Sequence, residues 1–144
     1  MTSALLLGPG YPEGQLEIRE EIKHLIEKGE GDDKEVIIME QVYANTQIPL
    51  HDAFERLLDN KKPDFIVALY TKDGVHNAVD FELGTLTCHF ETVKERLLIL
   101  THKDLDEKKI TRYLTEGLYY RVINLNYVTP KEAADRIVKF MNSF

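Results

Sequence analysis

Residues 63–70 read P-D-F-I-V-A-L-Y, and residues 77–91 read N-A-V-D-F-E-L-G-T-L-T-C-H-F-E after a short polar loop. The first segment is a continuous apolar run, which is typical of a strand covered on both faces of a sheet. The second segment places Val79, Leu83 and Leu86 at helical spacing, and Phe90 and Val93 continue the stripe. A buried strand followed by such a helix is the repeating unit of a parallel α/β sheet.

The same alternation extends from this unit to both ends of the chain. It predicts strands at residues 3–7, 36–39, 64–70, 96–101 and 121–125, and helices at residues 15–28, 50–60, 77–91, 108–116 and from 130 onwards. Thr129, Pro130 and Glu132 form the clearest helix start, with a cap, a proline at the first position and a capping-box acid. The pattern predicts an α/β, flavodoxin-like (Rossmann-like) doubly wound five-stranded parallel sheet of order 2-1-3-4-5, a three-layer sandwich.

Length and composition exclude several classes of protein. The 144 residues suit a single domain spanning residues 1–144. Acidic side chains outnumber basic ones by 25 to 18, so no binding to polymeric nucleic acid is expected. Cys88 is the single cysteine and can form neither an internal disulfide nor a multi-cysteine zinc site. The 5 histidines are scattered, so we expect no metal and no cofactor.

No apolar run approaches the roughly 20 residues that a membrane helix needs, and the first residues lack the charge of a signal segment. We therefore expect a cytoplasmic protein that does not associate with membranes. In a doubly wound sheet, ligands bind beyond the carboxyl ends of the strands, where the winding reverses between the first and third strands. The loops at residues 8–14 and 71–76 are expected to face each other across a functional crevice there.

The first of these loops is rich in glycine but matches no phosphate-binding fingerprint. Its spacing is G-x-G-x-x-x-G, and Pro9 and Pro12 remove two amide donors that a phosphate cradle would use. Gly8 and Gly10 could let a ligand approach the backbone, and Tyr11 could offer a ring face for stacking. The same residues could equally form a tight turn between strand and helix.

Glu82 is the candidate reactive side chain. At about 100° per residue it lies some 60° from the centre of the apolar stripe, so it belongs to neither the core nor the solvent face. Asn77 is a plausible N-cap with Asp80 in the first turn, which places Glu82 close to the crevice. We expect a half-sheltered carboxylate that the helix dipole holds ionised, as nucleophilic attack on a sugar carbon requires. The alternative is a boundary glutamate that reaches water.

These residues resemble a known family. L-G-P-G-Y (7–11) resembles the G-x-G-aromatic opening of the nucleoside 2-deoxyribosyltransferases, and D-F-E-L-G (80–84) resembles their helix with the nucleophilic glutamate. The second half of the chain is similar to the related 2′-deoxynucleoside 5′-monophosphate N-glycosidases. The resemblance implies that Glu82 cleaves an N-glycosidic bond by hydrolysis or transfer, and that Asp64 is structural. The expected substrate-binding residues are Gly8, Pro9, Gly10, Tyr11, His76 and Asn77.

The chain departs from this family at three places. His76 stands where the transferases usually carry an aspartate and the nucleotide hydrolases a serine; it could donate to a phosphate or be an ordinary loop histidine. Leu6 stands where a tyrosine usually supports the nucleophile. The acid expected on the second helix falls on Phe54 or Arg56, with Glu55 adjacent.

The resemblance implies a small-molecule nucleoside or nucleotide as partner, and a homo-oligomer. Phe81 and Cys88 lie opposite the core stripe of their helix and could form a subunit interface, or be isolated exposed side chains. A second hypothesis is a non-catalytic nucleotide-binding or interaction module, because the scaffold also resembles the TIR-like domains. Leu6 and the missing second-helix acid favour the module, whereas the spacing that leads to Glu82 favours the enzyme.

Overall fold

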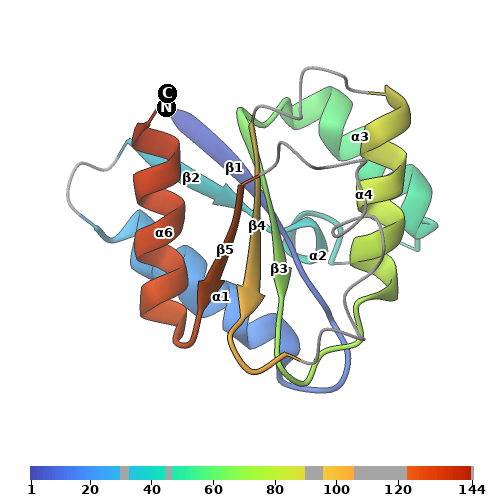
Figure 1. Cartoon of the computed structure of the whole chain (residues 1–144). Coiled ribbons are helices and arrows are strands. Elements are labelled where there is room, and N and C mark those ends of the chain that lie inside the picture. Colours follow the sequence, from blue (N-terminus) through green and yellow to red (C-terminus); the bar gives the residue numbers. More distant parts are fainter. Residues whose placement is uncertain (30–32, 45–46, 90–95, 106–122, 144) are drawn as a thin grey trace.

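The computed structural model describes residues 1–29, 33–44, 47–89, 96–105 and 123–143. Within these residues the chain forms one sheet of five parallel strands, in the order β2-β1-β3-β4-β5 (Figure 1). This order confirms the doubly wound topology predicted from the sequence. The strands are β1 (Thr2–Leu7), β2 (Lys34–Ile37), β3 (Phe65–Tyr70), β4 (Leu97–His102) and β5 (Ile123–Tyr127). The helices are α1 (Gln15–Glu27), α2 (Met39–Val42), α3 (Leu50–Lys61), α4 (Asn77–His89) and α6 (Pro130–Asn142).

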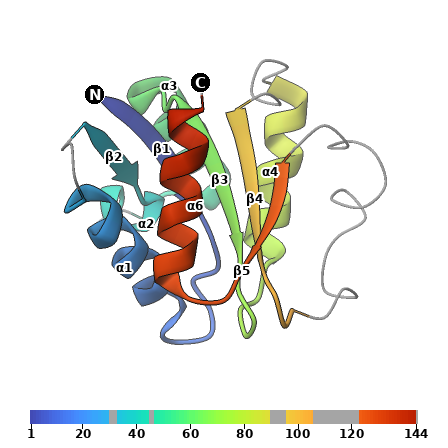
Figure 2. The same cartoon turned by 60° about the vertical axis from the view of Figure 1, so that its left-hand side comes forward.

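Helices cover both faces of the sheet, which confirms the three-layer sandwich. Helices α1 and α6 lie side by side on one face, and α3 and α4 lie on the other (Figures 1 and 2). Because successive side chains of a strand point to opposite faces, β1 contributes Leu5 and Leu7 to the α3/α4 layer and Ala4 and Leu6 to the α1/α6 layer.

The ends of several elements differ from the predicted ones. The strand expected at residues 36–39 ends at Ile37, and Met39 begins the short helix α2. This earlier end places Glu40 just beyond the carboxyl end of β2. The cap of α6 is confirmed, because Thr129 Oγ1 accepts a hydrogen bond from Glu132 N at 3.2 Å. The helix predicted at residues 108–116 and the stripe residues Phe90 and Val93 lie outside the described residues.

The loops that follow β1 and β3 meet at the carboxyl edge of the sheet, at the lower side of Figure 1. Val75 N donates to Tyr11 O at 2.9 Å. A Cβ added at Gly74 would lie 2.5 Å from Pro9 Cγ, so the two loops are packed against each other. The two loops therefore face each other as expected, but at these residues they are in contact rather than separated by a crevice.

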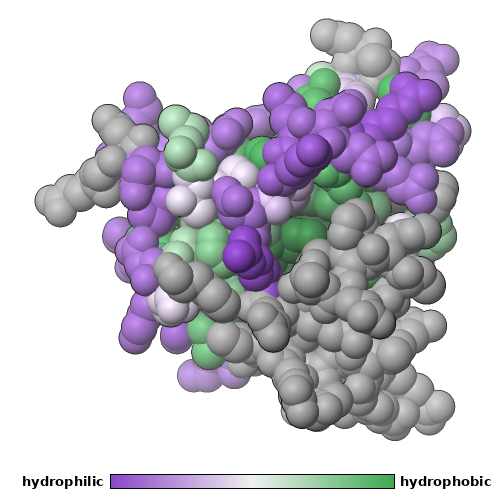
Figure 3. Space-filling model, turned by 90° about the horizontal axis from the view of Figure 1, so that it is seen from above, coloured by the Kyte–Doolittle hydropathy of each residue, from purple (hydrophilic) through white to green (hydrophobic). Residues whose placement is uncertain are grey.

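The amino edge of the sheet is joined by a polar contact of the kind expected for Asp64. The carboxylate of Asp64 accepts from Ser3 N at 2.9 Å, and Asp64 N donates to Ser3 O at 3.0 Å. These bonds tie the start of β1 to the start of β3. Seen from this edge, hydrophilic residues cover much of the coloured surface and hydrophobic ones show between them (Figure 3). Among the described residues, no helix combines the length and the apolar character needed to cross a membrane.

Candidate active site

Glu82 lies in the second turn of α4 and is almost fully buried, with 3% of its surface exposed. The helix begins at Asn77, and the carbonyl of His76 accepts its first bond from Asp80 N at 3.0 Å. His76, not Asn77, therefore takes the N-cap position. The predicted half-sheltered position of Glu82 is also wrong. The position of Glu82 around its helix indicates only whether the side chain faces the sheet. It does not account for burial by loops and by the short helix α2 at the end of the sheet.

The protonation state of Glu82 differs from the expected one as well. The pKa of Glu82 is raised from 4.5 to about 8, mainly because burial disfavours the charged form and also because of the negative charge of Glu40, while the positive charge of Arg19 lowers it. One pKa unit corresponds to about 1.4 kcal/mol, whereas a helix N-terminus contributes roughly 0.3–1 kcal/mol. Desolvation therefore outweighs the helix dipole, and Glu82 is mainly a neutral acid at pH 7 in this structure. Within the described residues, its Oε2 atom has no hydrogen-bond partner.

Arg19 supplies the positive charge of the site from α1. Its side chain is 1% exposed, and both terminal nitrogens of its guanidinium donate hydrogen bonds to the Glu40 carboxylate. The same nitrogens reach the backbone, Nη1 donating to Leu6 O at 3.4 Å and Nη2 to Pro9 O at 3.3 Å. A planar fork suits this double contact with a carboxylate, which a lysine ammonium could not reproduce. The pair therefore joins the end of β1 to the start of α2.

The glycines of the first loop lie against this ion pair. A Cβ added at Gly8 would lie 2.6 Å from Arg19 Cδ, so the absence of a side chain at Gly8 makes room for the arginine stem. A Cβ added at Gly10 would lie 3.7 Å from Glu40 Oε2, an ordinary contact distance. Pro9 is buried, and Tyr11 is 71% exposed. At Gly8, the close approach to the backbone that a ligand could have made is made by a side chain of the protein itself.

His76 is held inside its own loop. It is buried, and its Nε2 atom accepts from Thr71 N at 2.9 Å while its ring lies 4.9 Å from that of Tyr70. An accepting nitrogen carries no proton, so in this arrangement Nε2 does not donate to a phosphate. Thr71 in turn donates to Gln15 Oε1 at 2.5 Å. The geometry agrees with the alternative of an ordinary loop histidine, and Asn77 beside it is exposed.

The positions at which the sequence suggested a second-helix acid lie on α3. On α3, Phe54 is buried in the core, Arg56 is exposed and Glu55 is half-buried. Within the described residues, the carboxylate whose charge raises the pKa of Glu82 is that of Glu40, from the start of α2. Leu6 belongs to the α1/α6 layer, so its side chain faces away from the layer that contains α4.

Sequence reasoning missed Arg19 and Glu40, although one of them left a signal. The buried residues of α1 are Gln15, Arg19, Ile22 and Ile26, at spacings of four, three and four residues. An arginine on such a stripe must be paired or bonded to be buried, and that is a reason to look for a carboxylate. Glu40 carried no comparable signal, because its position depends on β2 ending earlier than the apolar run suggests.

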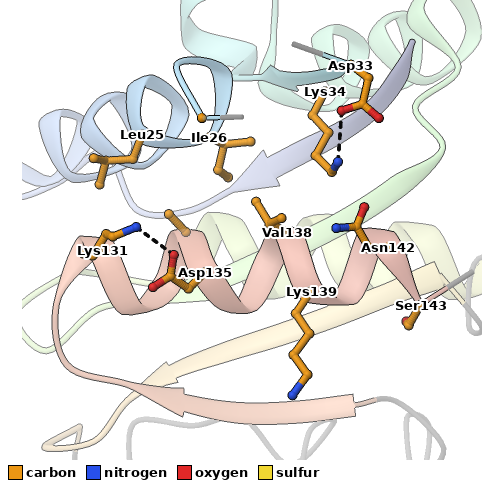
Figure 4. Close-up of a pocket in the computed structure, with 12 residues that line it drawn as sticks. Leu25, Ile26, Asp33, Lys34, Lys131, Asp135, Val138, Lys139, Asn142 and Ser143 are labelled. Atoms are coloured by element: carbon orange, nitrogen blue, oxygen red, sulfur yellow. Dashed lines mark hydrogen bonds and ion pairs between the residues drawn. The ribbon is translucent and has the colours of Figure 1, made fainter. Parts of the chain in front are cut away.

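Two other features of the structure lie apart from Glu82. Phe81 is 52% exposed on α4, and the side chain of Cys88 lies outside the described part of the chain. A hollow of about 730 Å³ lies between α1 and α6, in the helix layer opposite α4 (Figure 4). Four of its charged residues form two ion pairs, Lys131 with Asp135 at 2.9 Å and Lys34 with Asp33 at 3.0 Å. Glu82 is not among the residues that line this hollow.

In the described ranges, no group of three histidine, cysteine or acidic side chains is placed to hold a metal ion. No protein-family model matches the chain, and no curated protein matches it. The chemistry of the site therefore has to be inferred from Glu82 and the Arg19–Glu40 pair.

Proposed function

We propose that this chain cleaves the N-glycosidic bond of a 2-deoxyribonucleoside or its 5′-monophosphate, with Glu82 as the nucleophile. The observation that carries the proposal is a carboxyl group 3% exposed, with one oxygen unpartnered within the described residues, at the point where the sheet changes its winding. Burying such a group costs free energy. Carboxyl groups with strongly raised pKa values gather at reactive sites, and the resemblance of residues 80–84 to the transferases points to the same side chain.

The proposed step uses the ionised form of Glu82. One oxygen attacks the anomeric carbon, the C–N bond breaks with its electrons going to the base, and the base takes up a proton. Water then resolves the glycosyl ester in a hydrolase, or a second base does so in a transferase. Positive charge develops on the sugar during bond cleavage, and the negative charges of Glu82 and Glu40 would both stabilise it.

The proposal extends to the surroundings of the protein. The substrate is a small nucleoside or nucleotide, and the assembly is a homo-oligomer in the cytoplasm. Phe81, exposed on α4, supports a contact between copies, because a large apolar side chain gains free energy when another subunit covers it.

A panel of deoxynucleosides and their 5′-monophosphates tests the proposal, with free bases resolved by chromatography. Release should fall by at least about 1,000-fold in Glu82→Gln, because the nucleophile is lost while the shape is kept. Glu27→Gln is the matched control, since Glu27 is a half-buried glutamate paired with Lys23 on α1. Equal release by wild type and Glu82→Gln, with both folded by circular dichroism, would contradict the proposal.

One observation favours the non-catalytic nucleotide-binding module as a second candidate. The loops after β1 and β3 are closed on each other, and Glu82 is nearly inaccessible in this structure. A module of this kind would be stabilised by a deoxynucleotide in a thermal unfolding experiment, equally in wild type and Glu82→Gln, and would release no base.

A further inference from the structure

Arg19 is a buried side chain at the carboxyl edge of the sheet that makes several hydrogen bonds. Its two terminal nitrogens contact one carboxylate and two backbone carbonyls, and its stem passes over Gly8. Burying a cation is costly unless its partners are well placed. The fold nevertheless buries this one to 1% exposure to hold a carboxylate whose side chain is 35% exposed. A purely structural ion pair could sit at the surface, as Lys131 and Asp135 do.

The turn against which Arg19 holds Glu40 packs on the loop that leads into α4, the helix of Glu82: Arg19 bonds Pro9 O, and Val75 N donates to Tyr11 O. Within the described residues, the charges that act on Glu82 are those of Glu40, from α2, and Arg19, from α1. Arg19 and Glu40 largely cancel each other at a distance, but each still acts on a near neighbour. The cluster therefore contains one cation, one fixed anion and one carboxyl group whose charge can change.

We propose that Arg19 is a positioning residue for Glu82: by clamping Glu40 against the turn at residues 8–10, it keeps a second carboxylate beside the reacting one. Two carboxylates around one site favour a positively charged group between them. That group is the sugar carbon in the cleavage of a glycosidic bond, so the chemical meaning of this inference rests on the proposed function. The positioning itself does not, because it concerns how three side chains of the free protein affect one another.

The charges of the cluster predict the direction in which each variant changes the pKa of Glu82. Glu40→Gln removes a negative charge near Glu82 and leaves Arg19 without its counter-ion, and both changes favour the ionised form of Glu82. Arg19→Met removes the only cation of the cluster and leaves Glu40 charged, which does not favour that form. The two variants break the same ion pair. A general loss of packing would therefore change the pKa of Glu82 in the same direction in both.

Carbon-13 NMR of the full chain, labelled at glutamate side-chain carboxyls, measures this directly. The signal of Glu82 is the one that disappears in Glu82→Gln. In Glu40→Gln the pKa of Glu82 should fall by about 1 unit or more, a tenfold change in its ionisation constant. In Arg19→Met it should stay or rise. Glu27→Gln, which neutralises another ion-paired glutamate near α1, should leave it unchanged.

Two results would overturn the inference: an unchanged pKa of Glu82 in Glu40→Gln, or a fall in Arg19→Met as large as that in Glu40→Gln. The titration needs no substrate, so it stays decisive if no base is ever released. If base is released, both Arg19→Met and Glu40→Gln should lower kcat by about tenfold or more at pH 9.5, where Glu82 is ionised in wild type and in Glu40→Gln, with KM little changed, because they act on the transition state. A rise in KM alone would instead assign Arg19 to substrate binding.

Discussion

The two edges of the sheet use the same kinds of side chain in opposite ways. At the amino edge, the Asp64 carboxylate is half-buried and accepts from Ser3 N, and Lys34 at the start of β2 pairs with Asp33. At the carboxyl edge, Arg19 Nε and Glu82 Oε2 are buried and, within the described residues, have no partner.

The polar groups of the amino edge stabilise the fold, whereas the buried groups of the carboxyl edge are candidates for function. The amino edge satisfies its polar groups, so changes there should alter stability by small amounts. The carboxyl edge keeps groups that lower stability, which proteins do where such groups serve a reaction or a ligand. The comparison predicts how variants at each edge will behave.

The largest expected effect is the pH dependence of cleavage. An ionised nucleophile with a pKa near 8 makes kcat/KM fall about tenfold for each pH unit below that value, and level off above it. Initial rates of base release between pH 5 and pH 9.5 measure this, at substrate concentrations well below KM. A profile that instead rises toward low pH would make Glu82 an acid rather than a nucleophile.

The next effect concerns stability at the carboxyl edge. Glu82 has a raised pKa in the folded state, so its contribution is fully present below the unfolded value near 4.5 and is lost as the pH rises to about 8. Wild type should therefore lose stability relative to Glu82→Gln by roughly 1.4 kcal/mol per pH unit across that window. Urea unfolding of both proteins at several pH values measures the difference, and a constant difference would contradict the raised pKa.

Two glycine substitutions test whether the carboxyl edge needs the space beside Arg19. Gly8→Ala would bring a Cβ to 2.6 Å from Arg19 Cδ and should cost about 1–3 kcal/mol of stability. Gly84→Ala, on α4, meets no atom within 4 Å and should be neutral or stabilise by up to about 1 kcal/mol. Thermal unfolding of the two variants checks this; equal effects would mean that Arg19 does not depend on the space at Gly8.

The smallest effect is expected at the amino edge. Asp64→Ala removes the acceptor of Ser3 N and should lower the free energy of unfolding by about 1 kcal/mol. Asp33→Ala breaks the pair with Lys34, in which the aspartate is exposed, and should change the free energy of unfolding by less than Asp64→Ala does. Both variants should keep full cleavage activity, and a loss of activity in either would break the division between the two edges.

The sheet order was predictable from the sequence because apolar runs and helical stripes report burial directly. Val79, Leu83 and Leu86 are buried as their spacing indicates. The site was predictable only in part. Glu82 was identified from its place on α4, but its full burial depends on contacts between segments far apart in the chain. Arg19 and Glu40 are 21 residues apart and meet only because β1 and β2 are neighbours.

The most direct test of Glu82 as nucleophile is to trap the glycosyl ester. Wild type is mixed with a cleaved deoxynucleoside, quenched in acid within the first turnover and digested, and the peptides are analysed by mass spectrometry. We expect an added deoxyribosyl group on the peptide that contains Glu82, and none on that peptide in Glu82→Gln. Base release with the adduct on another peptide, or with none at any quench time, would contradict it.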